Sequence, residues 1–454
     1  MSESDNFSKL FSKYDVPAPR YTSYPTVPYW SVTPTDYEWT AHMTRALETP
    51  QGSYCLYLHI PYCETLCTFC GCNTSITKDH KKEKPYVDMI LKEWEIYKEK
   101  VPLLMEKPLR EIHLGGGTPT FLSEEHLDQL LGKLLQGVRK DPNHFQGSIE
   151  VDPRRTRVTQ LEVLRRHGIS RISLGVQDFE PEVQRLVNRI QPYDITRNIT
   201  VEARRLGFTS VNFDLIYGLA KQTPESMKRT TELTVELRPD RIALYSFALV
   251  PWIKPQQRLF KDEDLPVAAE KRKLYEIARE ILLEAGYVEV GMDHFALPTD
   301  GLAKAITNKT LHRNFMGYTD VRTDVLLGLG VSSISETPWS FHQNEKVLSQ
   351  YEQKLNSSEV PTLRGHVLSE EDRTHRALIL ELMTRGSVGL LNSQQELQAQ
   401  DFLKEMISDG LVEVKNMSVK VTEKGKPFLR NICVFFDMHL RRNQPQTRIF
   451  SQSI

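Results

Sequence analysis

The alternation of strand-like and helix-like segments between residues 54 and 286 constrains the fold of this chain more than any other feature. Short β-branched or apolar runs alternate there with amphipathic stretches. The expected strands are 56–60, 111–114, 148–151, 171–176, 210–216 and 241–247, and the expected helices are 84–100, 123–138, 158–167, 193–206, 223–237 and 267–286. Six such β/α units in succession predict an α/β fold with a parallel sheet wrapped by helices.

Four cysteines directly follow the first predicted strand, in the ten residues 63–72. The C-x3-C-x2-C spacing of Cys63, Cys67 and Cys70 lets one loop place three sulfurs round a [4Fe–4S] cluster, and it leaves one iron open to a small molecule. A zinc site is disfavoured because no second ligand pair follows at zinc-finger spacing. Disulfides are disfavoured because the chain begins without an apolar signal segment and has six cysteines in 454 residues.

Charge and hydropathy exclude several classes of protein. With 58 Lys and Arg against 59 Asp and Glu, the net charge is −1, so no overall positive field attracts nucleic acid. No run of eighteen apolar residues occurs, so no membrane span is expected. Reduced thiols, the lack of an export signal and an oxygen-sensitive type of cofactor predict a cytoplasmic protein.

Polar residues follow the predicted strands at their carboxyl ends, where α/β barrels collect active residues. The glycines of 115–117 would let backbone amides approach a ligand closely, although a tight turn is the structural alternative. Asp214 lies among apolar neighbours, where a carboxylate is costly unless it is paired or bound to a ligand. Arg189 could supply a counter-charge, but most arginines on helix surfaces are solvated. The other polar strand ends carry Thr118, Glu150, Asp152, Gln177 and Asp178.

The two ends of the chain differ from the repeating part. Residues 1–52 are expected to form an N-terminal strap over the barrel, because prolines from Pro17 to Pro34 break any long helix before residue 36. Residues 53–366 are assigned to the barrel and a closing extension. Residues 367–454 read as helices near 371–385 and 394–408, a hairpin turning at 415–416 and a final helix from Pro427, which resembles a winged helix. Because residues 368–454 hold 12 Lys and Arg against 11 Asp and Glu, a lid over a large substrate is predicted rather than a DNA-binding surface.

In combination, the cysteine loop, the Gly-Gly-Gly-Thr-Pro turn at 115–119 and the six β/α units resemble the radical S-adenosylmethionine (SAM) enzymes. Within that superfamily, further motifs are similar to the oxygen-independent coproporphyrinogen III oxidases, also called coproporphyrinogen dehydrogenases. The resemblance covers nearly the whole chain. Its motifs are Arg-Tyr-Thr-Ser-Tyr-Pro-Thr at 20–26, Tyr-Leu-His-Ile-Pro at 57–61, the added Cys72, Gly-Val-Gln-Asp-Phe at 175–179, Asn-Phe-Asp-Leu-Ile-Tyr-Gly at 212–218 and Arg-Asn-Ile-Cys at 430–433.

The resemblance implies a partial (β/α)6 TIM-like barrel and a set of cofactor ligands. Cys63, Cys67 and Cys70 would hold the cluster, SAM would chelate the fourth iron, Tyr57 would lie against the cluster, and Cys72 would be required for catalysis without being a ligand. The first SAM would contact Gly116, Gly117, Thr118, Glu150, Gln177, Arg189 and Asp214. A second SAM would contact Phe69, Ile216, Ala248, Phe315 and Ile334. Met316 stands where the family has glutamine; a thioether accepts hydrogen bonds poorly, which puts the pose of the second SAM in question.

The resemblance also implies a reaction. One electron from the reduced cluster would cleave SAM, and the 5′-deoxyadenosyl radical would abstract a β-hydrogen from a propionate side chain. Loss of carbon dioxide and of one electron would leave a vinyl group, so that two propionates of coproporphyrinogen III react to give protoporphyrinogen IX in anaerobic haem biosynthesis. An unidentified electron donor and acceptor, a monomer and no nucleic acid or membrane partner are expected. None of the histidines near 294 and 312 is assigned a catalytic role.

Two other functions within the same superfamily remain open at this stage. One is a haem chaperone, a group that shares the barrel and the three-cysteine loop but lacks the fourth cysteine and the long strap. The other is a radical SAM methyltransferase that acts on haem, for which loss of residues 20–26 would have been expected. Cys72 and residues 1–52 favour the oxidase. The polar strand ends argue against a purely structural iron–sulfur protein.

Overall fold

The computed structural model describes residues 3–453 and has a twelve-stranded sheet at its centre. Six neighbouring strands in the middle of the sheet pair in parallel, each with the next along the chain. These strands are β1 (Tyr54–Ile60), β4 (Leu109–Gly116), β5 (Gln146–Val151), β6 (Ile169–Gln177), β7 (Ser210–Tyr217) and β8 (Arg241–Ser246). The six predicted β/α units are therefore confirmed.

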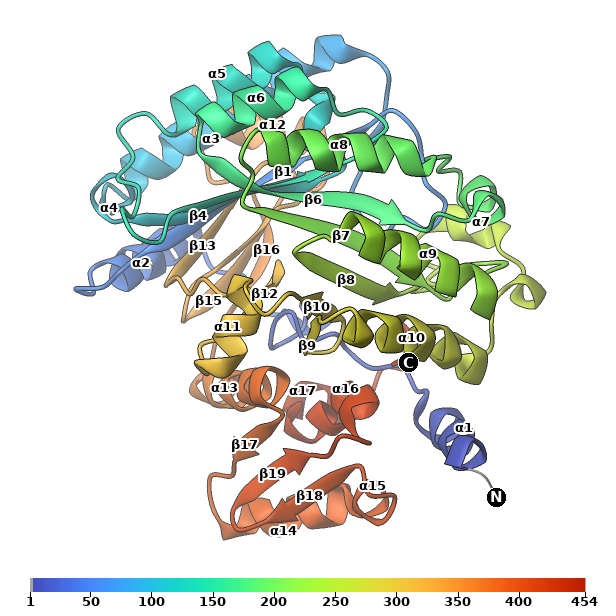
Figure 1. Cartoon of the computed structure of the whole chain (residues 1–454). Helices are drawn as coiled ribbons and strands as arrows, with labels where there is room; N and C mark the ends of the chain where they lie inside the picture. Colours follow the sequence, from blue (N-terminus) through green and yellow to red (C-terminus); the bar gives the residue numbers. More distant parts are fainter. Residues whose placement is uncertain (1–2, 454) are drawn as a thin grey trace.

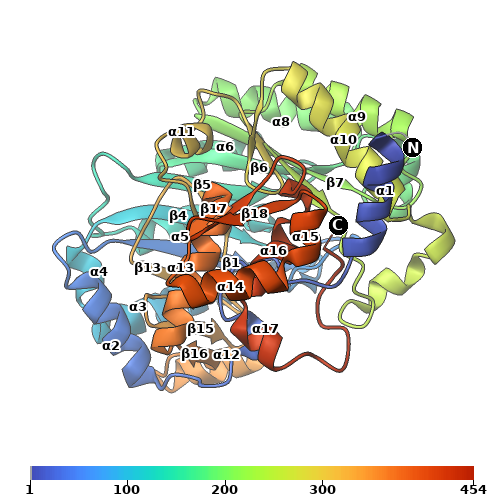
Figure 2. The same ribbon diagram turned by 90° about the horizontal axis from the view of Figure 1, so that it is seen from below.

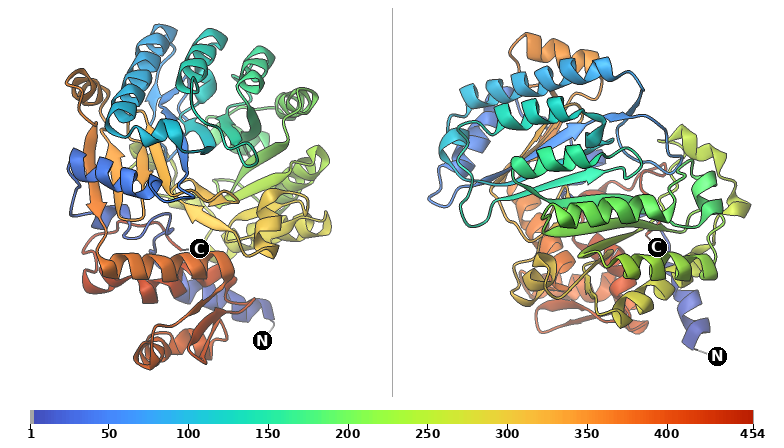
Figure 3. Two further views of the ribbon diagram at one scale, coloured as in Figure 1. Left: turned by 90° about the vertical axis from the view of Figure 1, so that its left-hand side faces the viewer. Right: turned by 45° about the horizontal axis from the view of Figure 1, so that its top comes forward.

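Helices cover the convex face of this curved sheet (Figures 1 and 3). They are α3 (Glu83–Lys100), α5 (Glu124–Leu134), α6 (Val158–Arg166), α7 (Pro181–Leu186), α8 (Tyr193–Arg205), α9 (Pro224–Leu237) and α10 (Ala268–Glu284). Helix α5 shows why these segments fold locally, because Ser123 caps its first turn by accepting a hydrogen bond from the amide of His126. Its buried leucines recur every three or four residues and so form one apolar face against the sheet.

Strands from residues 288–367 extend the sheet at both edges. On the β1 side, β13 (Val325–Leu329) pairs in parallel with β1 and is followed by β14 (Ile334–Glu336), β15 (Ser340–Asn344) and β16 (Thr362–Val367). On the β8 side, β10 (His294–Ala296) and β9 (Val288–Val290) add two antiparallel strands. Within residues 3–453, β16 and β9 do not pair, so the sheet is open. The seventh parallel strand, β13, was missed because no crossover helix of the repeating kind follows it.

Shorter elements connect these parts. They are α2 (Asp36–Leu47), β2 (Tyr62–Cys63), β3 (Ser75–Ile76), α4 (Leu103–Glu106), α11 (Gly301–Thr307), the hairpin β11 (His312–Asn314) and β12 (Gly317–Thr319), and α12 (Leu348–Asn356). The strap also begins with a helix, α1 (Glu3–Tyr14). Helix α1 was not expected from the proline distribution, but the prolines begin only at Pro17, so residues 3–14 are free to form three turns.

The C-terminal region contains a small three-stranded sheet in the order β17-β19-β18. Its elements are α13 (Glu370–Arg385), β17 (Ser387–Gly389), α14 (Ser393–Phe402), α15 (Lys404–Ser408), β18 (Val412–Lys415), β19 (Ser418–Val421), α16 (Leu429–Cys433) and α17 (Met438–Arg442). The helix expected over 394–408 is divided in two, and the single final helix expected from Pro427 is wrong, because short helical segments replace it.

The strap packs into this C-terminal region. Leu10, Phe11, Tyr21 and Tyr24 belong to the same buried apolar cluster as residues 378–436. The two ends of the chain also lie near each other, with α1 beside α10 and α15 (Figure 2). The first and last parts of the sequence therefore share one core.

Arg430 joins the strap to the chain terminus. Its buried guanidinium donates to the backbone carbonyls of Pro19 (2.9 Å), Gln452 (3.0 Å) and Ser453 (3.2 Å), and also to that of Ala18. Burial lowers the pKa of Arg430 to about 9. Four carbonyls thus replace the water that a guanidinium would otherwise bind, and they determine the path of the strap toward the barrel.

Candidate active site

A cavity of about 590 Å³ lies on the inner side of the curved sheet. Its wall is formed by the cysteine loop, by strands β4 to β8, by His294 of β10 and by Arg20 of the strap. Most of the predicted site residues line it: Cys63, Cys67, Phe69, Cys70, Cys72, Gly116, Gly117, Thr118, Glu150, Gln177, Arg189, Asp214, Ile216 and Ala248. Tyr57, Phe315 and Ile334 do not line the cavity, whereas Met316 does.

Contacts on two sides hold the cysteine loop. On one side, Asn188 donates to the carbonyl of Leu66 (2.7 Å). On the other, the segment 254–257 after β8 supplies bonds to the carbonyls of the cysteines and of Phe69, namely Lys254 to Cys72 (2.7 Å), Gln256 to Cys70 (2.9 Å) and Gln257 to Phe69 (3.2 Å). These three side chains were not predicted, because they belong to an irregular segment that carries no motif.

Cationic and polar donors surround the sulfurs. The guanidinium groups of Arg189 and Arg154 lie 3.7 and 3.9 Å from Sγ of Cys67. The hydroxyl of Thr118 lies 3.3 Å from Sγ of Cys63, whose pKa burial raises to about 11. Positive groups beside a thiol favour the thiolate, which is the form that ligates metal.

Cys70 and Cys72 form a hydrogen-bonded pair of thiols. The bond from Cys72 lowers the pKa of Cys70 to about 6, and the same bond raises the pKa of Cys72 well above its ordinary value. The two thiols therefore share one environment, in which the charge of one opposes that of the other.

The spacing of the sulfurs does not match a preformed site for one zinc ion. Zn–S bonds are about 2.3 Å long, so the ligand atoms of one zinc ion lie within about 4.6 Å of one another. Among the described histidine, cysteine and acidic residues, three ligand atoms come within 4.8 Å of one another only in the group His366, Asp372 and His439. The assignment of Cys63, Cys67 and Cys70 to a cluster stays a prediction.

The glycine turn after β4 approaches the protein's own backbone. A Cβ atom on Gly117 would lie 2.8 Å from the carbonyl carbon of Pro61, and Gly116 has a φ of +112°. The amide of Gly116 donates to Glu150 (3.3 Å) and that of Gly117 to the carbonyl of Ile60 (2.7 Å). In this structure both amides have partners within the protein, and the glycines allow the turn to pack against the start of the cysteine loop while it lines the cavity.

Glu150 and His113 form a polar pair in the wall of the cavity. Nε2 of His113 lies 3.3 Å from Glu150, and its Nδ1 lies 2.6 Å from the hydroxyl of Ser148. Burial alone would raise the pKa of Glu150, but the bond from His113 holds it below its ordinary value. Glu150 is thus a carboxylate at neutral pH. His113 was missed because it lies inside a strand, where a histidine carries no motif.

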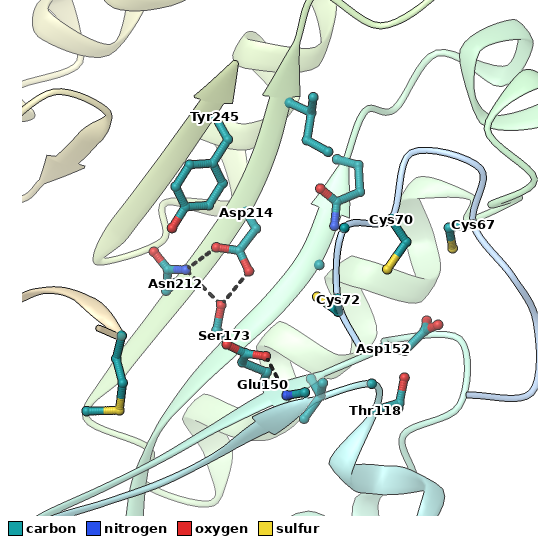
Figure 4. A pocket seen from close by; sticks show the side chains of 18 of the residues that line it. Cys67, Cys70, Cys72, Thr118, Glu150, Asp152, Ser173, Asn212, Asp214 and Tyr245 are labelled. Atoms are coloured by element: carbon teal, nitrogen blue, oxygen red, sulfur yellow. Dashed lines mark hydrogen bonds between the residues drawn. The ribbon is translucent and has the colours of Figure 1, made fainter. Parts of the chain in front are cut away.

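Asp214 is a carboxyl group in the cavity wall whose surroundings disfavour its charged form. It accepts hydrogen bonds from Ser173 (2.8 Å) and Asn212 (2.9 Å), yet burial, followed by the negative charge of Glu150, raises its pKa to about 6. Figure 4 shows this group across the pocket from the cysteines, with Tyr245 beside it. A buried carboxyl with a perturbed pKa in a cavity is a common feature of functional sites.

Arg189 is buried and not on a solvated helix face. Its guanidinium donates to Asp152 (3.3 Å) and to the carbonyl of Gly175 (2.6 Å), and its Nε has no hydrogen-bond partner among the described residues. Gln177 follows with a φ of +67°, at an irregularity in the pairing of β6 and β7. Arg189 therefore brings a positive charge between the cysteine loop and the end of β6.

Tyr57 lies behind the wall of the cavity. Its ring stacks on that of His113 at 5.8 Å, and its hydroxyl lies 3.0 Å from Nδ1 of His59. Nε2 of His59 in turn lies 3.0 Å from the carbonyl of Asn73, at the end of the cysteine loop. Tyr57 therefore contacts the cavity wall at His113 and is linked by His59 to the end of the cysteine loop. Neither histidine was predicted as a site residue.

Comparisons with known proteins agree with this geometry. Residues 57–234 match the model of the "Radical SAM superfamily". This region contains the cysteine loop and most of the strands that line the polar cavity. The chain is therefore a radical SAM enzyme.

Full-length relatives define the family more narrowly. The oxygen-independent coproporphyrinogen III oxidase of Salmonella typhimurium is 39% identical over 442 residues, with 95% of each chain covered, and that of Synechocystis is 36% identical, with 98% of each covered. The chain belongs to the family of oxygen-independent coproporphyrinogen III oxidases. The solved structure of "Coproporphyrinogen III oxidase (HemN) from Escherichia coli" aligns with a TM-score of 0.87 and 38% identity, covering 93% of this chain and 98% of that one. Family membership makes the protein an oxidoreductase of the radical SAM type, with a [4Fe–4S] cluster and SAM as its cofactors.

No helix within residues 3–453 is both long and apolar enough to cross a membrane.

Proposed function

We propose that this enzyme converts two propionate side chains of coproporphyrinogen III to vinyl groups, giving protoporphyrinogen IX. The observation that carries the proposal is the arrangement of one cavity: three thiols on one side face Glu150 and Asp214 on the other. The donor set suits the cofactors of the family, because thiolates ligate iron and the carboxylates can accept hydrogen bonds from a cationic nucleoside. When bound, the reduced cluster and SAM supply the radical that removes a hydrogen atom from the substrate.

The residues of the chain would hold and orient these groups. Cys63, Cys67 and Cys70 would ligate the cluster, with Arg189 close enough to Cys67 to offset negative charge on its sulfur. Glu150 is ionised and Asp214 titrates at about pH 6, so both can accept hydrogen bonds from the amino and ribose groups of SAM. Cys72 lies in the cavity wall as a protonated thiol and can donate a hydrogen atom or proton near the substrate.

The reaction balances for each propionate. The side chain loses one hydrogen atom from its β-carbon, then one electron to an acceptor, and its carboxylate leaves as carbon dioxide. The remaining two carbons form the vinyl double bond. The cavity must therefore bind a carboxylate and keep water away from the β-carbon, which a wall of both polar and apolar side chains would favour.

A second SAM is part of the proposal. Phe69, Ile216 and Ala248 line the cavity beside Met316, whereas Phe315 and Ile334 lie outside its wall. The second molecule would therefore sit against the first three residues. We further propose a cytoplasmic monomer with no nucleic-acid or membrane partner. An unidentified donor would reduce its cluster, and an unidentified acceptor would take the electron that the substrate loses. Residues 367–454 would cover the substrate.

Anaerobic incubation tests the reaction. Reconstituted protein, SAM, a reductant and coproporphyrinogen III should yield 5′-deoxyadenosine, methionine, carbon dioxide and the divinyl product. Cleavage of SAM without carbon dioxide or a vinyl product would show that the substrate is wrong. Haem in place of coproporphyrinogen separates the alternatives, because a methyltransferase would modify it and a chaperone would bind it unchanged.

Two cysteine variants test the ligand assignment. Cys67→Ser should remove the visible absorption of the cluster together with SAM cleavage. Cys433→Ser is the matched control, since Cys433 is a buried thiol in the C-terminal core, outside the cavity. A Cys67→Ser protein that keeps its cluster and its turnover would overturn the assignment.

A further inference from the structure

Five arginines line the cavity, and Arg20 differs from the others in its partners. The other four form ion pairs with carboxylates: Arg154 and Arg189 with Asp152, Arg171 with Asp320, and Arg241 with Asp300. Arg20 makes no ion pair with any described residue. A guanidinium in a cavity wall that has no ion-pair partner keeps N–H donors that can bind an anion.

Residues outside the strap hold Arg20 in place at both its backbone and its side chain. The carbonyl of Arg20 accepts a hydrogen bond from Arg313 (3.3 Å), and its guanidinium donates to the carbonyl of Ser246 (3.0 Å) at the end of β8. Arg430 binds the carbonyls just before it. The guanidinium is half-buried, and one carbonyl uses only a part of its five N–H donors.

His294 lies in the same part of the wall. Its Nδ1 is 2.7 Å from the carboxylate of Asp293, and its ring packs edge-on between Tyr245 and Tyr318, each 5.7 Å away between ring centroids. Tyr245 directly precedes Ser246, whose carbonyl Arg20 binds, so both side chains have contacts at the end of β8. Nε2 of His294 has no hydrogen-bond partner among residues 3–453, while the side chain borders the cavity.

Asp293 determines which ring nitrogen of His294 is available. Burial alone would raise the pKa of Asp293, but the neighbouring His294 outweighs it and lowers the pKa to about 2. A permanent carboxylate at Nδ1 keeps a proton on that nitrogen, which leaves Nε2 to face a ligand. Arg313 and Arg20 also act on this carboxylate by charge and help to lower its pKa, but Arg20 forms no ion pair with it.

We propose that Arg20 and His294 together bind one propionate carboxylate of the tetrapyrrole substrate and orient it for hydrogen abstraction. This inference rests on the proposed function and adds the residues that recognise the substrate. A planar guanidinium matches a carboxylate in two parallel hydrogen bonds, and Nε2 of His294 can add a third when it carries a proton. Asp214 and Asp293 lie near enough to His294 to interact with it by charge, so a bound carboxylate would depend on the hydrogen bonds of Arg20 and His294 to offset their repulsion.

Binding of a fluorescent porphyrin tests the inference directly. The probes are coproporphyrin III, which carries the four propionates of the substrate, and its tetramethyl ester, which carries none of their charges. Cluster-loaded protein should bind the acid and bind the ester far less tightly. Arg20→Gln and His294→Asn should each weaken binding of the acid about 10- to 100-fold, because each loses charge-assisted hydrogen bonds, and neither should change binding of the ester.

The substitutions are chosen to separate recognition from folding. In His294→Asn the new amide can still donate to Asp293, as Nδ1 of His294 does, while the contact through Nε2 is lost. Arg20→Lys keeps the charge and should recover part of the affinity. Arg197→Gln, an exposed residue on α8, is the matched control and should bind as the wild type does. Wild-type affinity in both Arg20→Gln and His294→Asn, or an equal loss for the acid and the ester, would overturn the inference.

Turnover distinguishes this inference from the proposed function. With an active wild type, the two variants should raise KM for coproporphyrinogen III more than they lower kcat. Unchanged KM in both variants would reject the subsite and leave the reaction standing. An inactive wild type that still binds the porphyrin acid through Arg20 would reject the reaction instead.

Discussion

The replacement of Asp214 by asparagine should stabilise the folded protein, although it removes a carboxylate that we expect to bind SAM. The folded environment raises the pKa of Asp214 from 3.8 to about 6, first through burial and then through the charge of Glu150. Ionised Asp214 therefore costs about 3 kcal/mol at pH 8, since each pKa unit corresponds to about 1.4 kcal/mol. Asparagine removes this cost and fits the same hydrogen bonds, because Asn212 can donate to its oxygen and the hydroxyl of Ser173 can rotate to accept from its amide.

The sign of the pH dependence follows from the direction of the shift. A carboxyl whose pKa is raised on folding favours the folded state at low pH, and this contribution is lost as pH rises from 3.8 to about 6. The advantage of Asp214→Asn should thus be about 3 kcal/mol at pH 8 and about half of that at pH 5. Urea titrations of wild type and variant, prepared identically and without SAM, measure it.

Two results would contradict this reasoning. A variant less stable than the wild type at pH 8 would mean that Asp214 is not strained in the folded protein. An equal difference at pH 5 and pH 8 would mean that the carboxyl does not titrate between them. The same variant should bind SAM more weakly, as measured by equilibrium dialysis, because an amide accepts hydrogen bonds less strongly than a carboxylate.

Three further substitutions test other contacts. Gly117→Ala should shift the cysteine loop and destabilise the fold by about 1–3 kcal/mol, because its Cβ would lie 2.8 Å from the backbone of Pro61; an unchanged unfolding midpoint and cluster spectrum would refute this. Arg430→Met should release the strap, so that trypsin cleaves before residue 25 faster than in the wild type; equal cleavage rates would contradict the role of the four carbonyl bonds. His439 has a pKa raised by its hydrogen bond with Asp372, a contribution to stability that is present at pH 6 and is lost as pH rises through the raised pKa. The difference in unfolding midpoint between wild type and His439→Gln should therefore be larger at pH 6 than at pH 9, and a constant difference would argue against this titration.

The cluster at His366, Asp372 and His439 shows how contacts decide between roles for the same residue types. The three ligand atoms are close enough for a metal ion. However, Nδ1 of His366 accepts a hydrogen bond from the amide of Ser31 (3.3 Å), so the proton of that ring is on Nε2 and points to Asp372. A metal-bound histidine would instead carry its proton on the nitrogen away from the metal. The group is a hydrogen-bonded junction between the strap, β16 and the C-terminal helices.

Sequence patterns predicted the features whose causes are local in the chain. The six β/α units follow from the alternation of apolar runs and amphipathic stretches, which reflects the backbone geometry of strands and helices. The spacing of Cys63, Cys67 and Cys70 is likewise a property of one loop. Motifs at the strand ends placed Glu150, Gln177 and Asp214 in one cavity, because parallel strands bring their carboxyl ends to the same edge.

Tertiary structure alone decided what depends on residues far apart in the sequence. The cysteine pattern does not reveal that segment 254–257 holds its loop, and the strap motif does not reveal that Arg20 lines the same cavity as His294, more than 270 positions away. The ionisation of Asp214, the burial of Arg189 and the partners of the glycine amides also depend on packing, since burial and neighbouring charge set the free energy of each polar group. Periodicity and spacing specify which segments fold, whereas the electrostatics of the site arise only when those segments surround one cavity.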